Sequence, residues 1–266
     1  MTADPREVLT RWAPEPDFTV RYGTQPDHVA DVRLPAGQSG GPLIIFIHGG
    51  FWKAEFDRRH TAPLAVDLAG RGYPVASVEF RRVGQDGGGW PGTFTDVAEA
   101  VARVPGLIAE ALTGRGVAVP DLTRPVLAGH SAGGHLALWA AKRAGTPVRG
   151  VLALAPVADL GLAHRLGLGG GAVAALLGGG PEEVPERYAE ADPVRLLPSG
   201  VPAVVVHGTE DDRVPIEVGQ EYVAAARAAG DDVSLVELPG TEHFAVIDPR
   251  SAVWPQILAA LDTIAR

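Results

Sequence analysis

A serine at a predicted strand-to-helix turn is the residue best suited to nucleophilic chemistry. Residues 129–133 read Gly-His-Ser-Ala-Gly, with Ser131 in the middle. The residues before this stretch are mainly apolar and predict a buried strand, whereas residues 134–141 are rich in Ala and Leu and predict a helix. Such a sharp turn holds the serine oxygen out of the sheet, and the glycines prevent collisions with neighbouring backbone. A simpler alternative is a serine that only caps the helix.

A nucleophilic serine needs a base to take its proton, and His243 is our candidate. It lies in the sequence Pro-Gly-Thr-Glu-His-Phe, residues 239–244, directly after the last predicted strand. The chain contains 8 histidines, so a structural histidine is the alternative for this residue taken alone. Its order after Ser131 and its place on this loop favour the catalytic interpretation.

The base needs an acid that orients its ring, and the loop after the preceding strand offers three carboxylates. Residues 207–215 read His-Gly-Thr-Glu-Asp-Asp-Arg-Val-Pro. We favour Asp211 as the acid. Glu210 and Asp212 stay open as alternatives, with solvated loop carboxylates or a partner for Arg213 as their simpler interpretations.

Backbone donors for a developing oxyanion are expected in the sequence His-Gly-Gly-Phe, residues 48–51, which follows another buried strand. Paired glycines allow successive N–H groups to turn toward one point. We expect an oxyanion hole made by the N–H groups of Gly50, Phe51 and Ala132, the last being the residue after the nucleophile. A Gly-Gly turn without function is the alternative.

Three further residues are candidates for a substrate pocket. His48 is expected to hydrogen-bond within its loop and to brace the oxyanion hole, at the edge of the pocket. Trp52 follows the same motif, and Trp90 follows three glycines, so either indole could line an acyl or aryl pocket. Packing in the core is an equally good interpretation of both tryptophans.

Alternating strands and helices must bring these residues together. Two segments that alternate apolar and polar residues predict an antiparallel hairpin at a sheet edge, and six further apolar segments alternate with helical ones. The predicted strands are residues 18–22, 29–34, 43–47 and 74–80, the segment before Ser131, and residues 150–155, 203–206 and 233–238. We expect a single α/β domain over residues 1–266, with an eight-stranded, mostly parallel sheet and helices on both faces.

The connections between these strands predict helices and one insertion. A helix is expected over residues 94–112, with Thr93 or Thr95 as its cap and with a break or kink at Pro105. Residues 156–200 contain glycine runs and several prolines, and we expect them to form a small cap over the site.

Composition limits the possible partners and chemistries. The formal net charge is -9, and no basic run is present, so we expect neither a nucleic-acid nor a membrane partner. The chain has no cysteine, which rules out disulfides and thiolate chemistry, and the His and Asp spacing predicts no metal site. The first residues lack the apolar core of a signal peptide, so we expect a cytoplasmic location. A homodimer is left open.

Three separated motifs resemble those of the α/β-hydrolase superfamily, over nearly the full chain. Within it, the sequence His-Gly-Gly-Phe-Trp at residues 48–52 resembles the His-Gly-Gly-x-Trp signature of the kynurenine formamidase group. Related esterases carry a third glycine where this chain has Phe51. Residues 207–215 resemble the acid loop of esterases and prolyl-oligopeptidase-like hydrolases, in which the acid stands three residues before Val-Pro, and this selects Asp211. The resemblance implies no metal and no other cofactor.

These observations predict a serine hydrolase that cleaves a small ester or amide through an acyl-enzyme on Ser131. Aryl formamides, with N-formylkynurenine as the sharpest candidate, are one expected substrate class. The enzymatic alternatives are a general carboxylesterase and a small peptidase-like hydrolase. A protein of this fold that binds a ligand without chemistry is the alternative from another class.

Overall fold

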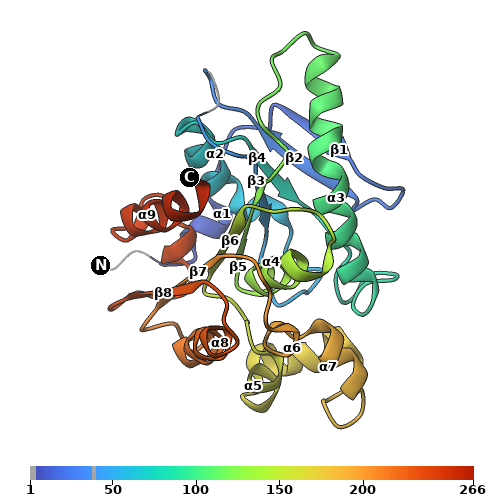
Figure 1. Cartoon of the computed structure of the whole chain (residues 1–266), viewed down its shortest axis with the longest axis vertical. Helices are drawn as coiled ribbons and strands as arrows, with labels where there is room; N and C mark the ends of the chain where they lie inside the picture. Colours follow the sequence, from blue (N-terminus) through green and yellow to red (C-terminus); the bar gives the residue numbers. More distant parts are fainter. Residues whose placement is uncertain (1–3, 38–39) are drawn as a thin grey trace.

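An eight-stranded sheet forms the centre of the computed structural model, which describes residues 4–37 and 40–266 (Figure 1). The strand order is β1-β2-β4-β3-β5-β6-β7-β8. Strand β2 runs antiparallel to both β1 and β4, and the other pairs are parallel. The strands are β1 (Phe18–Arg21), β2 (Val29–Arg33), β3 (Ile44–Ile47), β4 (Val75–Val78), β5 (Val126–His130), β6 (Gly150–Leu154), β7 (Ala203–Gly208) and β8 (Val233–Leu238). The predicted fold class is confirmed, including the antiparallel hairpin at one edge.

Helices cover both faces of this sheet. The α-helices are α1 (Glu7–Thr10), α2 (Ala62–Gly70), α3 (Gly92–Thr113), α4 (Ala132–Arg143), α5 (Leu160–Arg165), α6 (Leu168–Leu177), α7 (Pro185–Ala191), α8 (Ile216–Ala228) and α9 (Trp254–Ala265). Three 3-10 turns are η1 (Arg58–Thr61), η2 (Pro193–Leu196) and η3 (Ala245–Ile247). Within the described ranges, no helix has the length and apolar character needed to cross a membrane.

Two hydrophobic cores lie on opposite faces of the sheet, because successive strand residues point to opposite sides. In β3, Ile45 and Ile47 join the core that contains α3, α4 and α8, whereas Ile44 and Phe46 join the core that contains α2 and α9. Figure 1 shows α2 and α9 on one side of the sheet and α3 and α4 on the other. Strands buried on both faces explain the continuous apolar runs of the sequence.

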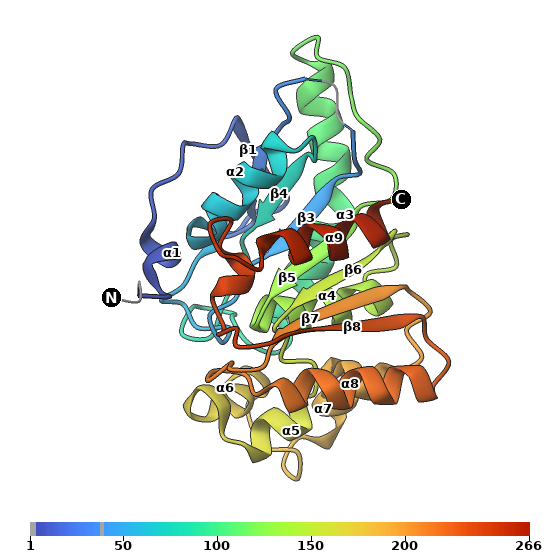
Figure 2. The ribbon, with the colours of Figure 1, turned by 90° about the vertical axis from the view of Figure 1, so that its left-hand side faces the viewer.

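The segment between β6 and β7 forms the expected helical insertion. Helices α5, α6 and α7 gather beside α8 at one end of the molecule in both views (Figures 1 and 2). The buried Asp192 joins its parts, since its carboxylate accepts the N–H groups of Leu160 at 3.1 Å and Gly161 at 3.3 Å. Burial raises the pKa of Asp192 to about 6.

Helix α3 lacks the predicted side-chain cap and the predicted break at Pro105. It begins at Gly92, no side chain caps it, and Thr93 instead donates to the carbonyl of Arg81 at 2.6 Å. Pro105 lies inside the helix without ending it. The missing hydrogen bond at Pro105 is tolerated because a stripe of buried apolar residues, including Phe94 and Ile108, holds the helix on the sheet.

The turn between β5 and α4 is the tightest backbone contact of the fold. A Cβ at Gly133 would lie 2.0 Å from the carbonyl oxygen of Ile47, and a Cβ at Gly129 would lie 2.2 Å from that of Gly133. Because both obstacles are backbone atoms, neither can move aside cheaply. Only glycine lets the first turn of α4 lie against the end of β3.

We therefore predict that Gly133→Ala destabilises the fold by about 3 kcal/mol or more, through overpacking against backbone. Gly106→Ala is the matched control, because a Cβ at this exposed position of α3 has no neighbour within 4 Å. The control should stabilise the protein by roughly 0.5–1 kcal/mol. Denaturant unfolding measures both. Equal midpoints for Gly133→Ala and the unmodified protein would contradict this account of the turn.

Candidate active site

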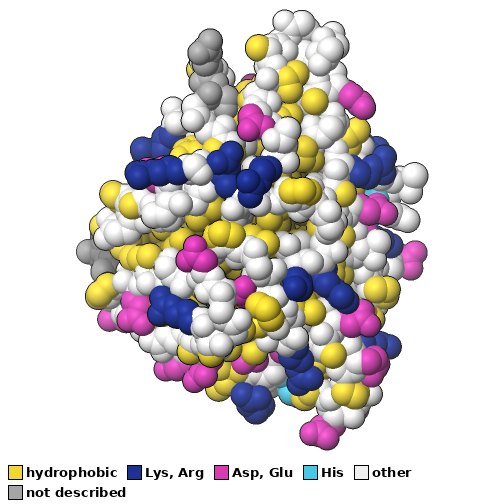
Figure 3. All heavy atoms as spheres, viewed as in Figure 1, with side chains coloured by type: hydrophobic (Ala, Val, Ile, Leu, Met, Phe, Trp, Pro, Cys, Tyr) yellow, Lys and Arg dark blue, Asp and Glu magenta, His cyan; other side chains and the backbone are white. Residues whose placement is uncertain are grey.

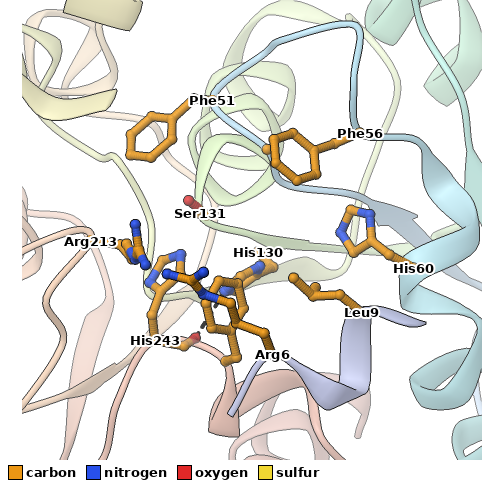
Figure 4. A pocket seen from close by; sticks show the side chains of 11 residues that line it. Arg6, Leu9, Phe51, Phe56, His60, His130, Ser131, Arg213 and His243 are labelled. Atoms are coloured by element: carbon orange, nitrogen blue, oxygen red, sulfur yellow. Dashed lines mark hydrogen bonds between the residues drawn. The ribbon is translucent and has the colours of Figure 1, made fainter. Parts of the chain in front are cut away.

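Ser131 lies between β5 and α4 in a strained conformation, with φ 56° and ψ -119°. A non-glycine residue in such a region costs on the order of 1–3 kcal/mol, and neighbouring contacts must hold it there. The Ser131 N–H donates to the carbonyl of Leu154 at 2.8 Å, and its carbonyl accepts N–H groups from His135 and Val157 at 3.1 and 3.2 Å. With its backbone fixed by three bonds, the serine side chain faces outward, as Figure 4 shows.

His243 and Asp211 form a close pair, as the sequence predicted. His243 Nδ1 lies 2.6 Å from Asp211 Oδ2. The other carboxylate oxygen, Oδ1, accepts the N–H groups of Arg213 and Val214 at 2.9 and 2.8 Å. Both Asp211 oxygens are therefore occupied, and Nδ1 of His243 is held by the carboxylate. The side chain of Asp212 is 75% exposed and contacts only Arg213, at 3.4 Å.

The environment of Asp211 keeps its carboxylate charged. Burial by itself would raise the pKa of Asp211, but His207, His243 and the N–H of Val214 outweigh it and lower the pKa well below its usual range. His207 Nε2 approaches Oδ2 at 3.4 Å. A charged carboxylate at this place can hold the imidazole in one tautomer and stabilise an imidazolium. Glu210, the remaining candidate acid, is exposed.

His130 fixes the backbone of His243. Its Nε2 donates to the carbonyl of His243 at 3.0 Å, and the two ring centroids lie 4.5 Å apart. Burial lowers the pKa of His130 well below its ordinary value, so the ring stays neutral. The neighbour of the serine in the motif thus positions the histidine loop.

The loop after β3 presents backbone donors beside Ser131. Gly50, Phe51 and Trp52 all have positive φ, at 111°, 50° and 57°. This left-handed run turns the N–H groups of Gly50 and Phe51 away from the sheet, and neither bonds to another residue of the described chain. Ala132 is the first residue of α4, so its N–H has no acceptor within the helix. All three predicted oxyanion donors are therefore placed on the two loops that flank Ser131.

A buried carboxylate supports residues 49–52, which we call the oxyanion loop after the donors predicted on it. His48 Nδ1 lies 2.8 Å from the carbonyl of Gly49, and its Nε2 lies 2.8 Å from Glu79 Oε1. Glu79 also accepts the N–H of Arg58 at 3.0 Å, and Arg82 approaches it at 3.3 Å. Burial opposes ionisation, but His48, Arg82 and the Arg58 N–H together lower the pKa of Glu79 to about 2. The loop is thereby tied to the end of β4.

A cavity of about 270 Å³ opens over Ser131 (Figure 4). Its lining combines aromatic and apolar side chains with histidines and arginines. The lining residues are Arg6, Leu9, Gly50, Phe51, Phe56, His60, His130, Ser131, Arg213, His243 and Phe244. Within residues 4–37 and 40–266, no group of three His, Asp or Glu side chains is arranged to hold a metal ion. A serine, a base, an ionised acid and free N–H donors around one cavity can together perform acyl transfer.

The three predicted pocket residues do not line this cavity. Trp52 is 1% exposed and meets the ring of His135 edge-on at 5.2 Å, within the core. Trp90 packs against Phe94 at 5.0 Å. His48 is buried beneath the oxyanion loop. The pocket assignment was therefore wrong, and core packing, the alternative for both tryptophans, agrees with the structure. His48 bonds within its loop as expected but does not reach the cavity. For Trp52 the cause is the run of positive φ values at Gly50, Phe51 and Trp52, which leaves Phe51 on the cavity side.

The insertion also differs from its predicted place over the site. None of its described residues lines the cavity. It supports the oxyanion loop from the side instead: Lys53 Nζ donates to the carbonyl of Gly169 at 3.0 Å. A Cβ at Gly169 would lie 2.7 Å from the ring of Phe51, so glycine is needed for this close contact.

Comparison with known proteins places this geometry in a family. The BD-FAE family model matches residues 30–225. The chain belongs to the BD-FAE family. The chain is also similar to the esterase LipC of Mycobacterium tuberculosis (strain ATCC 25618 / H37Rv). The two sequences are 25% identical over 244 residues, which cover 84% of this chain. The chain spans 58% of LipC, less than two thirds of that relative's length.

One further relative and one solved structure carry the names of different hydrolases. Kynurenine formamidase of Danio rerio is 24% identical over 243 residues, which cover 86% of this chain and 75% of that relative. A solved structure, the truncated form of a carbohydrate esterase from gut microbiota, superposes with a TM-score of 0.75 at 20% identity. That superposition covers 94% of this chain and 99% of the other, and it supports the α/β-hydrolase fold.

One wall of the cavity in this BD-FAE protein comes from α1, which sequence reasoning did not connect with the site. Arg6 and Leu9 line the cavity, and Val8 is 1% exposed. Arg11 holds the helix in place through a bidentate pair with Asp248, at 2.5 and 2.9 Å. Nothing local in residues 6–11 indicates this position, because the anchoring carboxylate lies 237 residues away along the chain.

Glu79 provides a test of the brace behind the oxyanion loop. Its pKa is about 2 in the fold against an ordinary 4.5, so its stabilisation is complete above pH 4.5 and is lost as the pH falls toward 2. We predict that Glu79→Gln lowers the free energy of unfolding by roughly 2–4 kcal/mol at pH 7 and flattens the pH dependence below 4.5.

Denaturant unfolding at several pH values measures this effect, with Glu110→Gln on the exposed side of α3 as the control. The control should reproduce the unmodified protein. A Glu79→Gln protein with the same acid sensitivity as the control would contradict the assigned role.

Proposed function

We propose that this chain is a serine carboxylesterase that cleaves small esters through an acyl-enzyme on Ser131. One observation carries the proposal: Ser131 and His243 line the same cavity, and His243 is hydrogen-bonded to the buried Asp211 at 2.6 Å. Membership of the BD-FAE family supports a hydrolase, and the esterase LipC among its relatives supports an ester as the substrate. A volume of about 270 Å³ favours small substrates.

The proposed reaction follows from the roles of these residues. Ser131 Oγ attacks the ester carbonyl while His243 Nε2 takes its proton, and Asp211 stabilises the imidazolium through Nδ1. The N–H groups of Gly50, Phe51 and Ala132 receive the oxyanion. His243 then gives the proton to the leaving alkoxide, and the C–O bond breaks. Water repeats the attack on the acyl-enzyme and releases the acid and free Ser131.

An aryl formamidase is the second candidate. Two observations favour it: the His-Gly-Gly-Phe-Trp sequence at residues 48–52 and the likeness to kynurenine formamidase of Danio rerio. The same nucleophile and donors would act on a formamide, with an aromatic amine as the leaving group. The formamidase is one relative beside several esterases of similar identity, so we place the ester first.

Hydrolysis of p-nitrophenyl acetate and N-formylkynurenine, measured side by side, separates the two candidates. A kcat/KM near or above about 10⁴ M⁻¹s⁻¹ on either substrate would be in the range of ordinary enzymes. Ser131→Ala should lower kcat by roughly 10⁴- to 10⁶-fold and abolish labelling by a fluorophosphonate. If the unmodified protein were not labelled and hydrolysed neither substrate, we would interpret the chain as a ligand-binding protein and not as an enzyme.

The acid is tested by two neighbouring variants. Asp211→Asn should lower kcat by roughly 10⁴-fold, because an amide cannot hold the correct tautomer of His243 or stabilise its cation. Asp212→Asn should change kcat less than threefold, since its side chain is 75% exposed and pairs only with Arg213. Steady-state kinetics on the better substrate measures both. If the two effects were exchanged, Asp212 would be the acid.

A further inference from the structure

The charged groups that line the cavity have one sign. The chain has 32 acidic and 23 basic residues, yet the lining contains two arginines, Arg6 and Arg213, and no carboxylate. The protein has a net charge of -9, so two cations at the cavity give it a local charge of the opposite sign. The local charge therefore calls for an anionic ligand.

The backbone of Arg213 is held by a hydrogen bond, whereas its guanidinium has few partners. Its N–H donates to Asp211 at 2.9 Å, which ties it to the catalytic loop. Its side chain is 37% exposed, and its buried Nε has no hydrogen-bond partner among the described residues. The nearest described carboxylate, that of Asp212, approaches at 3.4 Å and is itself 75% exposed. An exposed pair of this kind contributes little, so the guanidinium is available to a ligand.

Arg6 reaches the same region from the other wall. Its guanidinium forms no ion pair with any residue in the described part of the chain, whereas Arg11 on the same segment is paired with Asp248. Figure 4 shows the Arg6 side chain extending from α1 toward His243, with Arg213 on the far side of that ring. Both arginines thus belong to the part of the cavity lining that contains His243 in this view.

The other arm of the cavity has a different character. In Figure 4, Leu9, Phe56 and His60 lie away from Ser131 on the side opposite to Arg213. Burial lowers the pKa of His60 to about 3, so its ring is neutral, and its Nδ1 is buried without a partner. This arm suits an uncharged group.

We propose that the substrate is an ester whose leaving group carries a carboxylate, held by Arg6 and Arg213, while an uncharged acyl group enters the arm formed by Leu9, Phe56 and His60. The leaving group is assigned to the arginine side because His243, which protonates it, lines the cavity on the same side of Ser131 as both arginines in Figure 4. Arginine binds carboxylates in a planar, charge-assisted geometry, which suits this role. The inference rests on the proposed esterase function.

The test compares 4-acetoxybenzoate with 4-acetoxybenzamide, which carry a carboxylate and an uncharged amide at the same position of the leaving phenol; the ratio of their hydroxide-catalysed rates corrects for their different intrinsic reactivity. The measured quantity is the ratio of their kcat/KM values in the unmodified protein, in Arg6→Gln, in Arg213→Gln and in the double variant. We expect the anion preference to fall by roughly 5- to 10-fold in each single variant and further in the double one. It should also shrink as salt rises from about 0.01 M to 1 M, as the Debye length shortens from about 30 Å to 3 Å.

Arg103→Gln is the matched control, because Arg103 is exposed on α3 and does not line the cavity. Its ratio should equal that of the unmodified protein. A second pair places the charge in the acyl half: monophenyl succinate should be a poorer substrate than its uncharged methyl-ketone analogue, phenyl levulinate.

Each remaining outcome has a definite meaning. A benzoate-to-benzamide ratio that is no higher with the enzyme than with hydroxide would overturn the inference and leave the esterase function supported. An anion preference that survives the double variant would also overturn it, because other groups would then bind the carboxylate. A preference for monophenyl succinate would place the anion in the acyl half and refute the assignment. Turnover of none of these esters would refute the proposed esterase function itself.

Discussion

The close approach of the first turn of α4 to the end of β3 is the constraint on which the candidate site depends. At Gly133 the backbone of one element nearly touches the carbonyl oxygens of the other, and a single methyl group would lie 2.0 Å from Ile47 O. This contact sets the distance between the loop that carries Ser131 and the loop that carries Gly50 and Phe51. The proposed nucleophile and the proposed oxyanion donors follow different strands, yet backbone atoms alone fix their separation, and these have few ways to relax.

Charge is arranged in layers around this contact. The carboxylates of Glu79 and Asp211 are buried behind the two functional loops, each surrounded by donors that keep it ionised. The arginines Arg6 and Arg213 lie in front, at the cavity. On the face drawn in Figure 3, basic, acidic and hydrophobic side chains are interspersed, so the acidic excess of the chain forms no single patch there.

The predictable parts of the site are those that short sequence motifs indicate. Ser131 lies in a short motif between a strand and a helix, and Asp211 and His243 follow consecutive strands whose ends must meet at one edge of the sheet. The cavity walls were not predictable in the same way. The brace from Glu79 to His48 joins residues 31 apart, and the anchor of α1 joins residues 237 apart. Such contacts depend on tertiary packing, which also overrides the local expectation of a break at Pro105.

The anchored segment α1 has a practical consequence for how the protein is handled. Arg6 lies at the cavity, two residues after Asp4, the first residue that the structure describes. The other end leaves through α9, and Figure 2 shows the two termini on different sides of the molecule. A bulky group attached to the chain beside Arg6 would share the entrance with arriving substrate. Immobilisation through the C-terminus would leave that entrance free.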